Sequence, residues 1–455
     1  MKPAALLAIS LSSLIGLVSC TSHDEPPSIS INSSIKAYVT EPLTGLPAMK
    51  IFSAQANGLD RALIELIDSA KTTLAAAIYS FSLKTLVDAF ERACQRHVRV
   101  RLILESESAK QSRSINTISC ATIKLDQNSA LMHEKFLVAD RKTVWIGSHN
   151  WTCLDIYFDA NNALLIYDAS VANAFEVEFD EMFNGRFSIH KLDHDKKKFT
   201  IEGHVLELYF LPSDEAHDAV VEKIRAARSS IYVAMYAFTD NSLRQALLDA
   251  KERGVWVQAV WDYQGQFLTG SDVSAMLNRD VGVLEANPGL VHHKFAVIDE
   301  KIVITGSANW SRSGFEKNDE NLLILENSEI ARVYLAHWKG LYEDAFHYDR
   351  EPLEVPRLSV RVFERSEGSR ESGVRVEWRP HLVKPVETYE LCRAKSSQGP
   401  CERTFSDLAP GSDFFIDTSA NPNGTYYYRL RGRVGDRWSD YSNEYSNNSR
   451  ESCHE

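Results

Sequence analysis

The chain has 455 residues, too many for one ordinary hydrophobic core, so we expect two or three domains. Hydrophobic residues make up 44% of it and charged residues 25%, a composition typical of folded rather than disordered proteins. The net charge of −12 argues against a surface that is basic throughout and binds nucleic acid by charge alone, because such binding needs lysine and arginine facing phosphates. A local basic cleft is still compatible with an acidic protein.

Residues 1–20 predict an export signal. Lys2 precedes an apolar run over residues 4–18, which is too short for a confident membrane span, and Cys20 follows the run. This ending resembles a bacterial lipobox, which implies that Cys20 is lipidated and anchors the protein to a membrane. The alternative is an ordinary signal peptide that happens to contain a cysteine. We expect an exported, membrane-anchored lipoprotein, and Thr21 after the cysteine favours the outer membrane or periplasmic face if the cell is Gram-negative.

Residues 21–47 contain serine and proline and lack helical periodicity, so they predict a tether. Beyond the leader, no segment approaches the roughly twenty apolar residues of a spanning helix. We therefore expect the remainder of the chain to be soluble and tethered.

Two stretches resemble each other and predict a duplicated α/β unit. Residues 64–81 and 221–238 each combine an amphipathic helix, a small polar turn and an apolar run suited to a buried strand. Each is followed by a further helix and a further strand, expected at 83–95 and 98–104 and at 242–253 and 255–261. The offset between the two stretches is 157 residues, so the repeat unit is a domain half, placed at 48–190 and 191–348. Alternating helices and strands predict a mostly parallel sheet.

The same spaced motif follows the core of each repeat. The first copy is His133-x-Lys135 with Asp140, then Gly-Ser148-x-Asn150, and the second is His292-x-Lys294 with Asp299, then Gly-Ser307-x-Asn309. All spacings within the two copies are equal, and the two histidines are 159 residues apart. We expect His-x-Lys on a strand, where residues two apart share a face, and Gly-Ser-x-Asn in a turn after the strands 143–146 and 302–305. Glycine in this turn would let the backbone approach a ligand closely.

Two such repeats packed about a pseudo-twofold axis would gather two copies each of His, Lys, Ser and Asn. This set suits attack on a phosphodiester, which needs a nucleophile, a proton donor for the leaving oxygen and positive charge at the other phosphate oxygens. Histidine can fill either of the first two roles near neutral pH. The lysines and amides can fill the third without a metal.

These residues resemble the phospholipase D superfamily and its duplicated His-x-Lys-x4-Asp signature, over roughly residues 50–348. The resemblance implies an α/β fold of two α/β/α repeats packed as a pseudo-twofold dimer, with a monomeric catalytic unit and no cofactor or metal. It implies that one of His133 and His292 attacks phosphorus to form a phosphohistidine, while the other protonates the leaving alcohol and then activates water. The same resemblance assigns phosphate binding to Lys135, Lys294, Asn150 and Asn309 and support to Ser148 and Ser307. It implies a structural role for Asp140 and Asp299, through bonds within the motif.

One position departs from the family pattern. Glu320, 28 residues after His292, is where the family has an acid that orients an active-site histidine, and the equivalent residue of the first repeat is Asn161. An amide orients imidazole but does not stabilise imidazolium as a carboxylate does, so we expect the two histidines to be inequivalent. Asp159 is a candidate substitute for the missing acid. His149 and His293 are expected to lie off the shared face.

Residues 355–446 predict a small all-β sandwich, because valine and aromatic residues alternate with polar ones between turn-rich breaks. The pattern around Trp378 and Trp438 resembles a fibronectin type III module, which implies binding to a surface, a glycan or a protein; an unrelated sandwich is the alternative. Cys392 and Cys401 are our expected disulfide in this domain. The pairing of Cys94, Cys120, Cys153 and Cys453 stays open.

The sequence is compatible with three candidate functions. The first is a phospholipase D that cleaves the headgroup ester of a membrane phospholipid, and the second is a nuclease for DNA or RNA on the same scaffold. The third is a catalytically silent binding protein, which the intact double motif disfavours. A membrane anchor and an acidic balance favour lipid. Cardiolipin synthesis by transphosphatidylation is disfavoured, because those enzymes usually carry spanning helices.

Overall fold

The computed structural model describes residues 35–39, 58–110, 114–157, 159–192, 197–212, 214–285, 289–350, 361–364, 374–377, 387–409, 414–421, 424–434, 437–438, 441 and 445–446. The predicted signal peptide and Cys20 lie outside these residues. Within the described ranges, no helix combines the length and apolar character needed to cross a membrane.

The first repeat is built on a seven-stranded mixed sheet with the order β1-β7-β6-β5-β2-β3-β4. Its strands are β1 (Ile35–Val39), β2 (Thr73–Ile78), β3 (Arg99–Leu104), β4 (Thr122–Leu125), β5 (Lys135–Ala139), β6 (Thr143–Gly147) and β7 (Asn162–Ile166). Only β2, β3 and β4 run parallel, and the pairs from β2 through β5, β6 and β7 to β1 are antiparallel. The prediction of a mostly parallel sheet was therefore wrong. The connection between β5 and β6 is only three residues long, and such a short loop joins antiparallel neighbours.

The second repeat has an eight-stranded sheet with the same arrangement, in the order β12-β11-β10-β13-β14-β15-β9-β8. Its strands are β8 (Lys197–Ile201), β9 (His204–Leu211), β10 (Ser230–Met235), β11 (Trp256–Asp262), β12 (Val283–Glu285), β13 (Lys294–Ile298), β14 (Ile302–Gly306) and β15 (Glu320–Glu326). Strand β9 pairs with β15 as β1 pairs with β7. The tether predicted over 21–47 was thus wrong for residues 35–39, which form the edge of the first sheet. Their strand partner lies more than a hundred residues away, so no local pattern revealed it.

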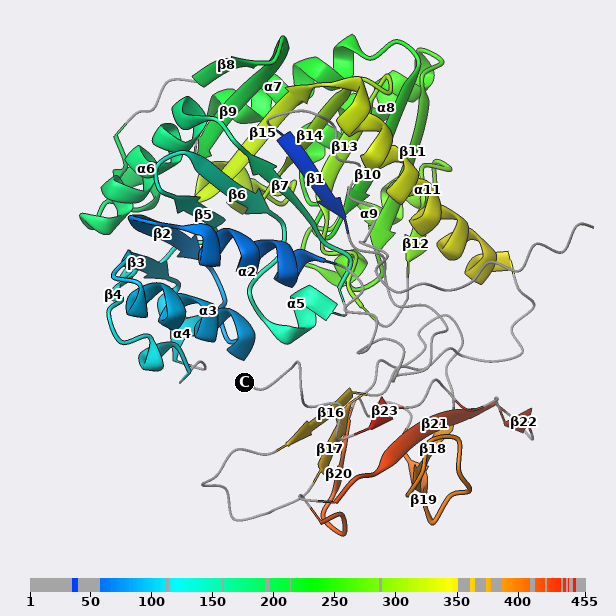
Figure 1. Ribbon diagram of the computed structural model, residues 1–455. Coiled ribbons are helices and arrows are strands. Elements are labelled where there is room, and N and C mark those ends of the chain that lie inside the picture. Colours follow the sequence, from blue (N-terminus) through cyan, green and yellow to red (C-terminus); the bar gives the residue numbers. More distant parts are fainter. Residues whose placement is uncertain are drawn as a thin grey trace, which may run out of the picture.

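The helices cover both faces of each sheet. They are α2 (Leu59–Ser69), α3 (Lys84–Gln95), α6 (Ala169–Phe183), α7 (Asp214–Ala226), α8 (Asn241–Glu252) and α11 (Ser328–Arg350), with the short helices α4 (Ser106–Ala109), α5 (Cys153–Tyr157), α9 (Val273–Leu277) and α10 (Arg312–Glu316). Helices α2 and α3 share a core with one face of the first sheet, and α7 and α8 share a core with one face of the second. Side chains of α6, α11 and the other faces of both sheets form a third core between the repeats. Figure 1 shows the first repeat in blue to teal and the second in green to yellow.

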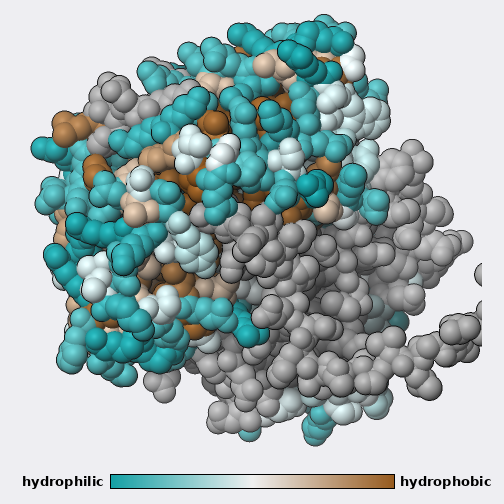
Figure 2. Space-filling view, turned by 45° about the horizontal axis from the view of Figure 1, so that its top comes forward, coloured by the Kyte–Doolittle hydropathy of each residue, from teal (hydrophilic) through white to brown (hydrophobic). Residues whose placement is uncertain are grey.

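The apolar runs that predicted strands are buried on both faces of the sheet. In β2, Leu74, Ala76 and Ile78 belong to the core with α2 and α3, whereas Ala75 and Ala77 belong to the core between the repeats. This explains why these strands appear as continuous apolar runs rather than alternating ones. The described surface in Figure 2 is mainly hydrophilic, with small hydrophobic areas among the polar ones.

The two motif aspartates fasten the strands of the motif to the preceding helix–strand turn. Asp140 accepts the backbone N–H groups of Lys71, Thr72 and Thr73 at 2.7 to 3.1 Å. Asp299 accepts the equivalent three N–H groups of residues 228–230. Both contacts are structural and involve no histidine or lysine of the motif.

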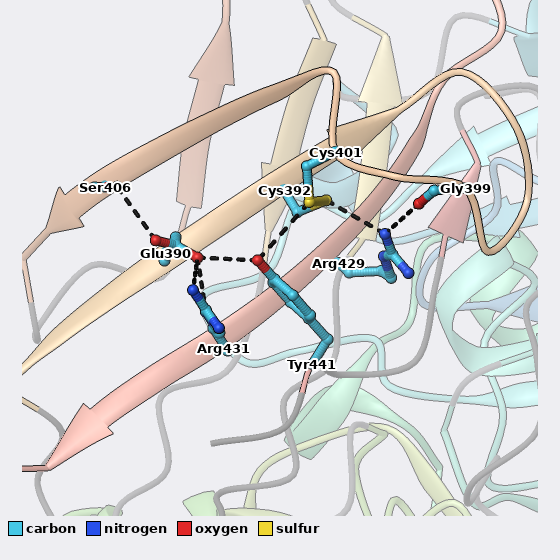
Figure 3. The surroundings of a disulfide bond; sticks show 8 residues. All are labelled: Glu390, Cys392, Gly399, Cys401, Ser406, Arg429, Arg431 and Tyr441. Atoms are coloured by element: carbon cyan, nitrogen blue, oxygen red, sulfur yellow. Dashed lines mark hydrogen bonds and ion pairs between the residues drawn. A yellow bond between two sulfur atoms is a disulfide. The ribbon is translucent and has the colours of Figure 1, made fainter. Parts of the chain in front are cut away.

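The C-terminal strands form two small antiparallel sheets. One contains β16 (Arg361–Glu364), β17 (Val374–Glu377) and β20 (Phe414–Asp417), and the other contains β18 (Thr388–Ala394), β19 (Arg403–Leu408), β21 (Tyr427–Val434), β22 (Arg437–Trp438) and β23 (Tyr445–Ser446). The predicted disulfide between Cys392 and Cys401 is confirmed. Around it, Arg429 donates to the Gly399 carbonyl oxygen, and Tyr441 donates to the Glu390 carboxylate (Figure 3).

A second disulfide joins Cys94 on α3 to Cys120 just before β4, and Cys153 is also disulfide-bonded. The first of these pairings depends on how α3 packs beside the 3₁₀ segment Ser114–Thr117 that precedes Cys120, which spacing along the chain does not reveal.

Candidate active site

The two His-x-Lys motifs occupy equivalent places at the beginning of β5 and β13. Lys135 and Lys294 are the first residues of these strands, and each histidine lies two residues earlier. All four side chains are buried, with 7% and 8% exposure for His133 and His292 and 1% for each lysine. Each ammonium donates to the carbonyl oxygen of the histidine of its own motif at 2.6 Å.

Two tyrosines accompany the motifs. Tyr79 follows β2 and Tyr236 follows β10; their ring centroids lie 5.0 and 5.3 Å from those of His133 and His292. The lysine ammoniums lie over the same rings, at 5.1 and 5.4 Å. Sequence reasoning missed these residues as part of the site. Their repetition at the 157-residue offset was the available signal.

Each histidine is oriented by a residue of the other repeat. The Nδ1 of His133 lies 2.8 and 2.9 Å from the two carboxylate oxygens of Glu320, and the Nδ1 of His292 lies 3.1 Å from the Oδ1 of Asn161. The backbone follows the same crossing, because the His133 N–H donates to the Asp319 carbonyl oxygen at 3.0 Å. Glu320 and Asn161 were aligned from the sequence with the histidines of their own repeats, and the structure pairs them across the repeats.

The charges of the two motifs act on one another. Burial lowers the pKa of His133, an effect that the Glu320 carboxylate opposes and that Lys135 and Lys294 reinforce. Burial also lowers the pKa of His292 well below its ordinary value, and Lys294, Lys135 and His133 add to this. The lysine of each repeat thus affects the histidine of the other repeat, in agreement with the crossed contacts of Glu320 and Asn161.

The ammonium groups of both lysines have lowered pKa values. Burial lowers the pKa of Lys135 to about 8, although Glu320 and Asp155 oppose it. Burial lowers the pKa of Lys294 well below its ordinary value, and Lys135 adds to the effect. An anion such as a phosphodiester would relieve the repulsion between these ammoniums and stabilise their charged forms.

The serines of the two turns hold the orienting residues. The Ser148 hydroxyl donates to the Oδ1 of Asn161 at 2.7 Å, and the Ser307 hydroxyl donates to Glu320 at 2.6 Å. Each hydroxyl also accepts the backbone N–H of the residue that follows the orienting one, Asn162 after Asn161 and Asn321 after Glu320, at 3.0 Å. The serines therefore contact the residues that orient the histidines.

The turn glycines serve the packing of strands. A Cβ at Gly147 would lie 2.2 Å from the Asn162 carbonyl oxygen, and one at Gly306 would lie 2.3 Å from that of Asn321. The prediction that these glycines make room for a ligand was wrong, because the neighbouring strands β7 and β15 occupy the space.

Of the two motif asparagines, Asn150 is bonded to the nearby carboxylate of Asp155. Asn150 donates to the Oδ1 of Asp155 through its backbone N–H at 3.0 Å and its side-chain amide at 3.1 Å. The side-chain oxygens of Asn150 and Asn309 are buried and have no hydrogen-bond partner within the described part of the chain.

Asp155 is an acidic group of the site that the sequence did not reveal. Its Oδ1 lies 3.4 Å from the Nδ1 of His292. Asp159, the suggested substitute for the missing acid, instead accepts the backbone N–H of Leu290 at 2.7 Å. The Asp159 carboxylate thereby supports the strand bridge between Ala160 and Val291, while the acid 3.4 Å from the His292 ring nitrogen is Asp155.

The neighbouring histidines and tryptophans are packed in the interior. His149 accepts the indole N–H of Trp145 at 2.9 Å, and His293 bonds His337 at 2.7 Å. Trp151 and Trp310 are fully buried in the cores of their repeats. These contacts agree with the expectation that His149 and His293 lie off the face that the motif residues share.

Comparison with known proteins matches both repeats to one family. The family model described as "Cardiolipin synthase, PLD-like domain", where PLD denotes phospholipase D, matches residues 63–183 and 220–342, more than half of the chain. Human mitochondrial cardiolipin hydrolase is 34% identical over 135 residues, which is 29% of this chain and 54% of that protein. A phospholipase D of Rickettsia bellii is 33% identical over 130 residues, which is 28% of this chain and 65% of that protein.

The chain thus spans between about half and two thirds of the length of these curated relatives. Among solved structures, phosphatidylserine synthase of Haemophilus influenzae covers 64% of this chain and 85% of its own, with a TM-score of 0.52 and 10% identity. This likeness shows a common fold across both repeats.

Proposed function

Because this chain belongs to the phospholipase D superfamily, we propose that it is a phosphodiesterase with one active site shared by its two repeats. The observation that carries the proposal is the crossed orientation of the histidines, His133 by Glu320 and His292 by Asn161. With both Nδ1 atoms engaged, the Nε2 of each ring is left for the substrate. Two imidazoles presented in this way suit a nucleophile on one side of a phosphorus atom and a proton donor on the other.

The reaction then proceeds in two displacements. One Nε2 attacks phosphorus, the P–N bond forms as the P–O bond to the alcohol breaks, and the second imidazole gives its proton to the leaving oxygen. In the second step that imidazole takes a proton from water, the water oxygen attacks phosphorus, and the P–N bond breaks. Lys135 and Lys294 neutralise the remaining phosphate oxygens, and Asn309 and Asn150 lie in the adjoining turns as further ligands.

We propose a phospholipid headgroup ester as the substrate. Phe267, which ends the short 3₁₀ segment Gln264–Phe267 after β11, is 65% exposed, and Leu268, which follows it, is 36% exposed. Asp262 links this segment to the site: one carboxylate oxygen accepts the Gly265 N–H, and the other accepts the N–H of Val291, the residue before His292. Apolar side chains at this edge suit contact with a lipid surface. Two similar proteins are named for phospholipid hydrolysis.

Cleavage of nucleic acid is the second candidate, because the same site chemistry applies to any phosphodiester and an exposed phenylalanine can stack on a base. A parallel assay distinguishes the two. The protein without residues 1–20 is incubated with vesicles of phosphatidylcholine or cardiolipin, and with single-stranded DNA or RNA, in the presence of EDTA. Release of headgroup or phosphatidic acid, absent in His133→Ala and His292→Ala, supports the lipid; cleavage of nucleic acid alone selects the alternative. Loss of all turnover with EDTA contradicts the metal-free mechanism.

We also propose that Cys20 is the lipidated N-terminus of the mature protein and that the C-terminal sheets act as a fibronectin type III-like binding domain for a surface, glycan or protein. The lipobox-like end of the apolar leader supports the first proposal. Cys20→Ala should move the protein from the membrane fraction to the soluble exported fraction. An unchanged distribution would contradict the anchor.

A further inference from the structure

The acidic group beside His292 comes from a position that has no acidic counterpart in the other repeat. Asp155 aligns with Gly314, 159 residues further along, whereas the Glu320 carboxylate aligns with Asn161. In the second repeat the carboxylate that contacts a histidine is therefore at position 320. In the first it is six residues before the equivalent place, on the short helix α5.

Asp155 is held in a fixed orientation by its neighbours. Oδ1 accepts the backbone and side-chain N–H groups of Asn150, and Oδ2 accepts the Thr152 hydroxyl at 2.8 Å. The backbone carbonyl oxygen of Asp155 accepts the side-chain amide of Asn161 at 2.9 Å. Asp155 and Asn161 are thus one connected unit against His292.

This unit also determines the proton position on His292. The side-chain amide nitrogen of Asn161 donates to the Asp155 carbonyl oxygen, so the Oδ1 of Asn161 faces His292 and Ser148. This amide oxygen can only accept hydrogen bonds. His292 must therefore carry its proton on Nδ1, and its Nε2 lone pair is free.

Asn161 supplies orientation but no charge. Lys294, Lys135, His133 and His293 each lower the pKa of His292 and so disfavour a positive imidazole. Asp155 lies within 3.4 Å of the ring, and its negative charge also raises the pKa of Lys135 and Lys294. A carboxylate at this place offsets the positive groups around the ring.

We propose that Asp155 is the positioning residue of His292, supplying from α5 the negative charge that Asn161 lacks. The inference rests on the proposed phosphodiesterase activity. In that reaction His292 gains positive charge, either on taking a proton or on binding phosphorus, and Asp155 stabilises that form. Asn161 keeps the ring in place.

The test compares three variants with the wild-type protein. Asp155→Asn removes the charge and keeps the shape. Asp88→Asn is the control, because it removes the same charge from an exposed carboxylate of the first repeat that pairs with Lys84 on α3. Asp155→Asn with Asn161→Glu moves the charge to the place that Glu320 has in the second repeat, where the Ser148 hydroxyl, like that of Ser307, is positioned to donate to it.

Two quantities are measured: kcat and KM on the substrate identified for the wild-type protein, and the titration of the His292 ring by NMR, assigned by its absence in His292→Ala. We expect Asp155→Asn to lower kcat by about tenfold or more with KM little changed, and to lower the pKa of His292. Asp88→Asn should leave both near wild type, and the double variant should recover both.

Wild-type kcat and an unchanged His292 titration in Asp155→Asn would overturn the inference. So would a loss of activity with an unchanged titration and no recovery in the double variant, because that pattern describes a structural role in α5. Failure of the proposed function itself is distinct, since the wild-type protein would then turn over no phosphodiester while the NMR titration still reports on Asp155.

Discussion

The imidazole of His133 is bonded by both carboxylate oxygens of Glu320, at 2.8 and 2.9 Å, although the two residues belong to different repeats and are 187 positions apart. The equivalent ring of His292 meets an amide oxygen of Asn161 at 3.1 Å. The two orienting residues therefore occupy pseudo-twofold related positions, but only Glu320 carries a charge. A carboxylate stabilises a positive imidazole, whereas an amide only orients it, so the two rings differ in their chemistry.

Glu320→Gln should lower kcat by roughly 100-fold or more and change KM much less, because the amide keeps the shape of the contact but no longer stabilises imidazolium. Steady-state kinetics on vesicles or on a soluble phosphodiester measure this. Glu326→Gln is the matched control: Glu326 ends the same strand, where it pairs with Lys223 and Lys301. Equal activity of the two variants would contradict the role of Glu320.

Activity should fall as the pH rises through about 8. The pKa of Lys135 is lowered to about 8, and that of Lys294 is also lowered well below its ordinary value. Only the ammonium form of each lysine neutralises phosphate, so the stabilisation is present below these pKa values and is lost above them. The measurement is kcat/KM against pH with circular dichroism as a check on folding. A profile that stays flat to about pH 10, where an ordinary lysine titrates, would count against charged lysines with lowered pKa values.

Asp140→Ala should destabilise the fold by about 1–3 kcal/mol and leave kcat nearly unchanged. Burial tends to raise the pKa of Asp140, but the N–H groups of Thr73, Lys71 and Thr72 outweigh it, and the pKa is lowered. The stabilisation is therefore full above the unfolded pKa near 4 and disappears as the pH falls through the lowered folded value. Urea unfolding at pH 7 and pH 3 measures both parts. A catalytic loss without a stability loss would place Asp140 in the chemistry instead.

Phe267→Ser with Leu268→Ser should weaken binding to phospholipid vesicles and lower activity on vesicles several-fold. Turnover of a soluble phosphodiester should be unchanged. Trp256→Ser is the control, since Trp256 is 59% exposed and begins the same strand β11, roughly 20 Å from its other end. Equal effects of the two changes on vesicle binding would show that the segment after β11 has no special contact with lipid.

The sequence predicted the parts of the site that depend on local spacing. Residues two apart on an apolar strand share a face, so His133 with Lys135 and His292 with Lys294 followed from the motif alone. The repeat offset then predicted that both copies belong to one fold. Asp140 and Asp299 make backbone contacts of a structural kind, but their partners Thr73 and Ser230 lie 67 and 69 residues earlier in the chain rather than within the motif.

The contacts missed from the sequence arise between segments that are distant along the chain. The partner of each histidine lies in the other repeat, so no spacing within a repeat connects His133 to Glu320. Strand β1 is short and is defined by its pairing with β7. Asp155 has no counterpart in the second repeat, so the comparison of repeats that revealed the motifs also concealed it.

The claim that both repeats build one site is tested most directly by the turnover of His133→Ala, His292→Ala and the double variant under the same conditions. A shared site predicts that each single change lowers kcat by at least about 10³-fold and that the double variant is no slower than the slower single one, because residues that act as a unit are not additive. Two independent sites would leave about half of the wild-type turnover in each single variant, and that result would contradict the account.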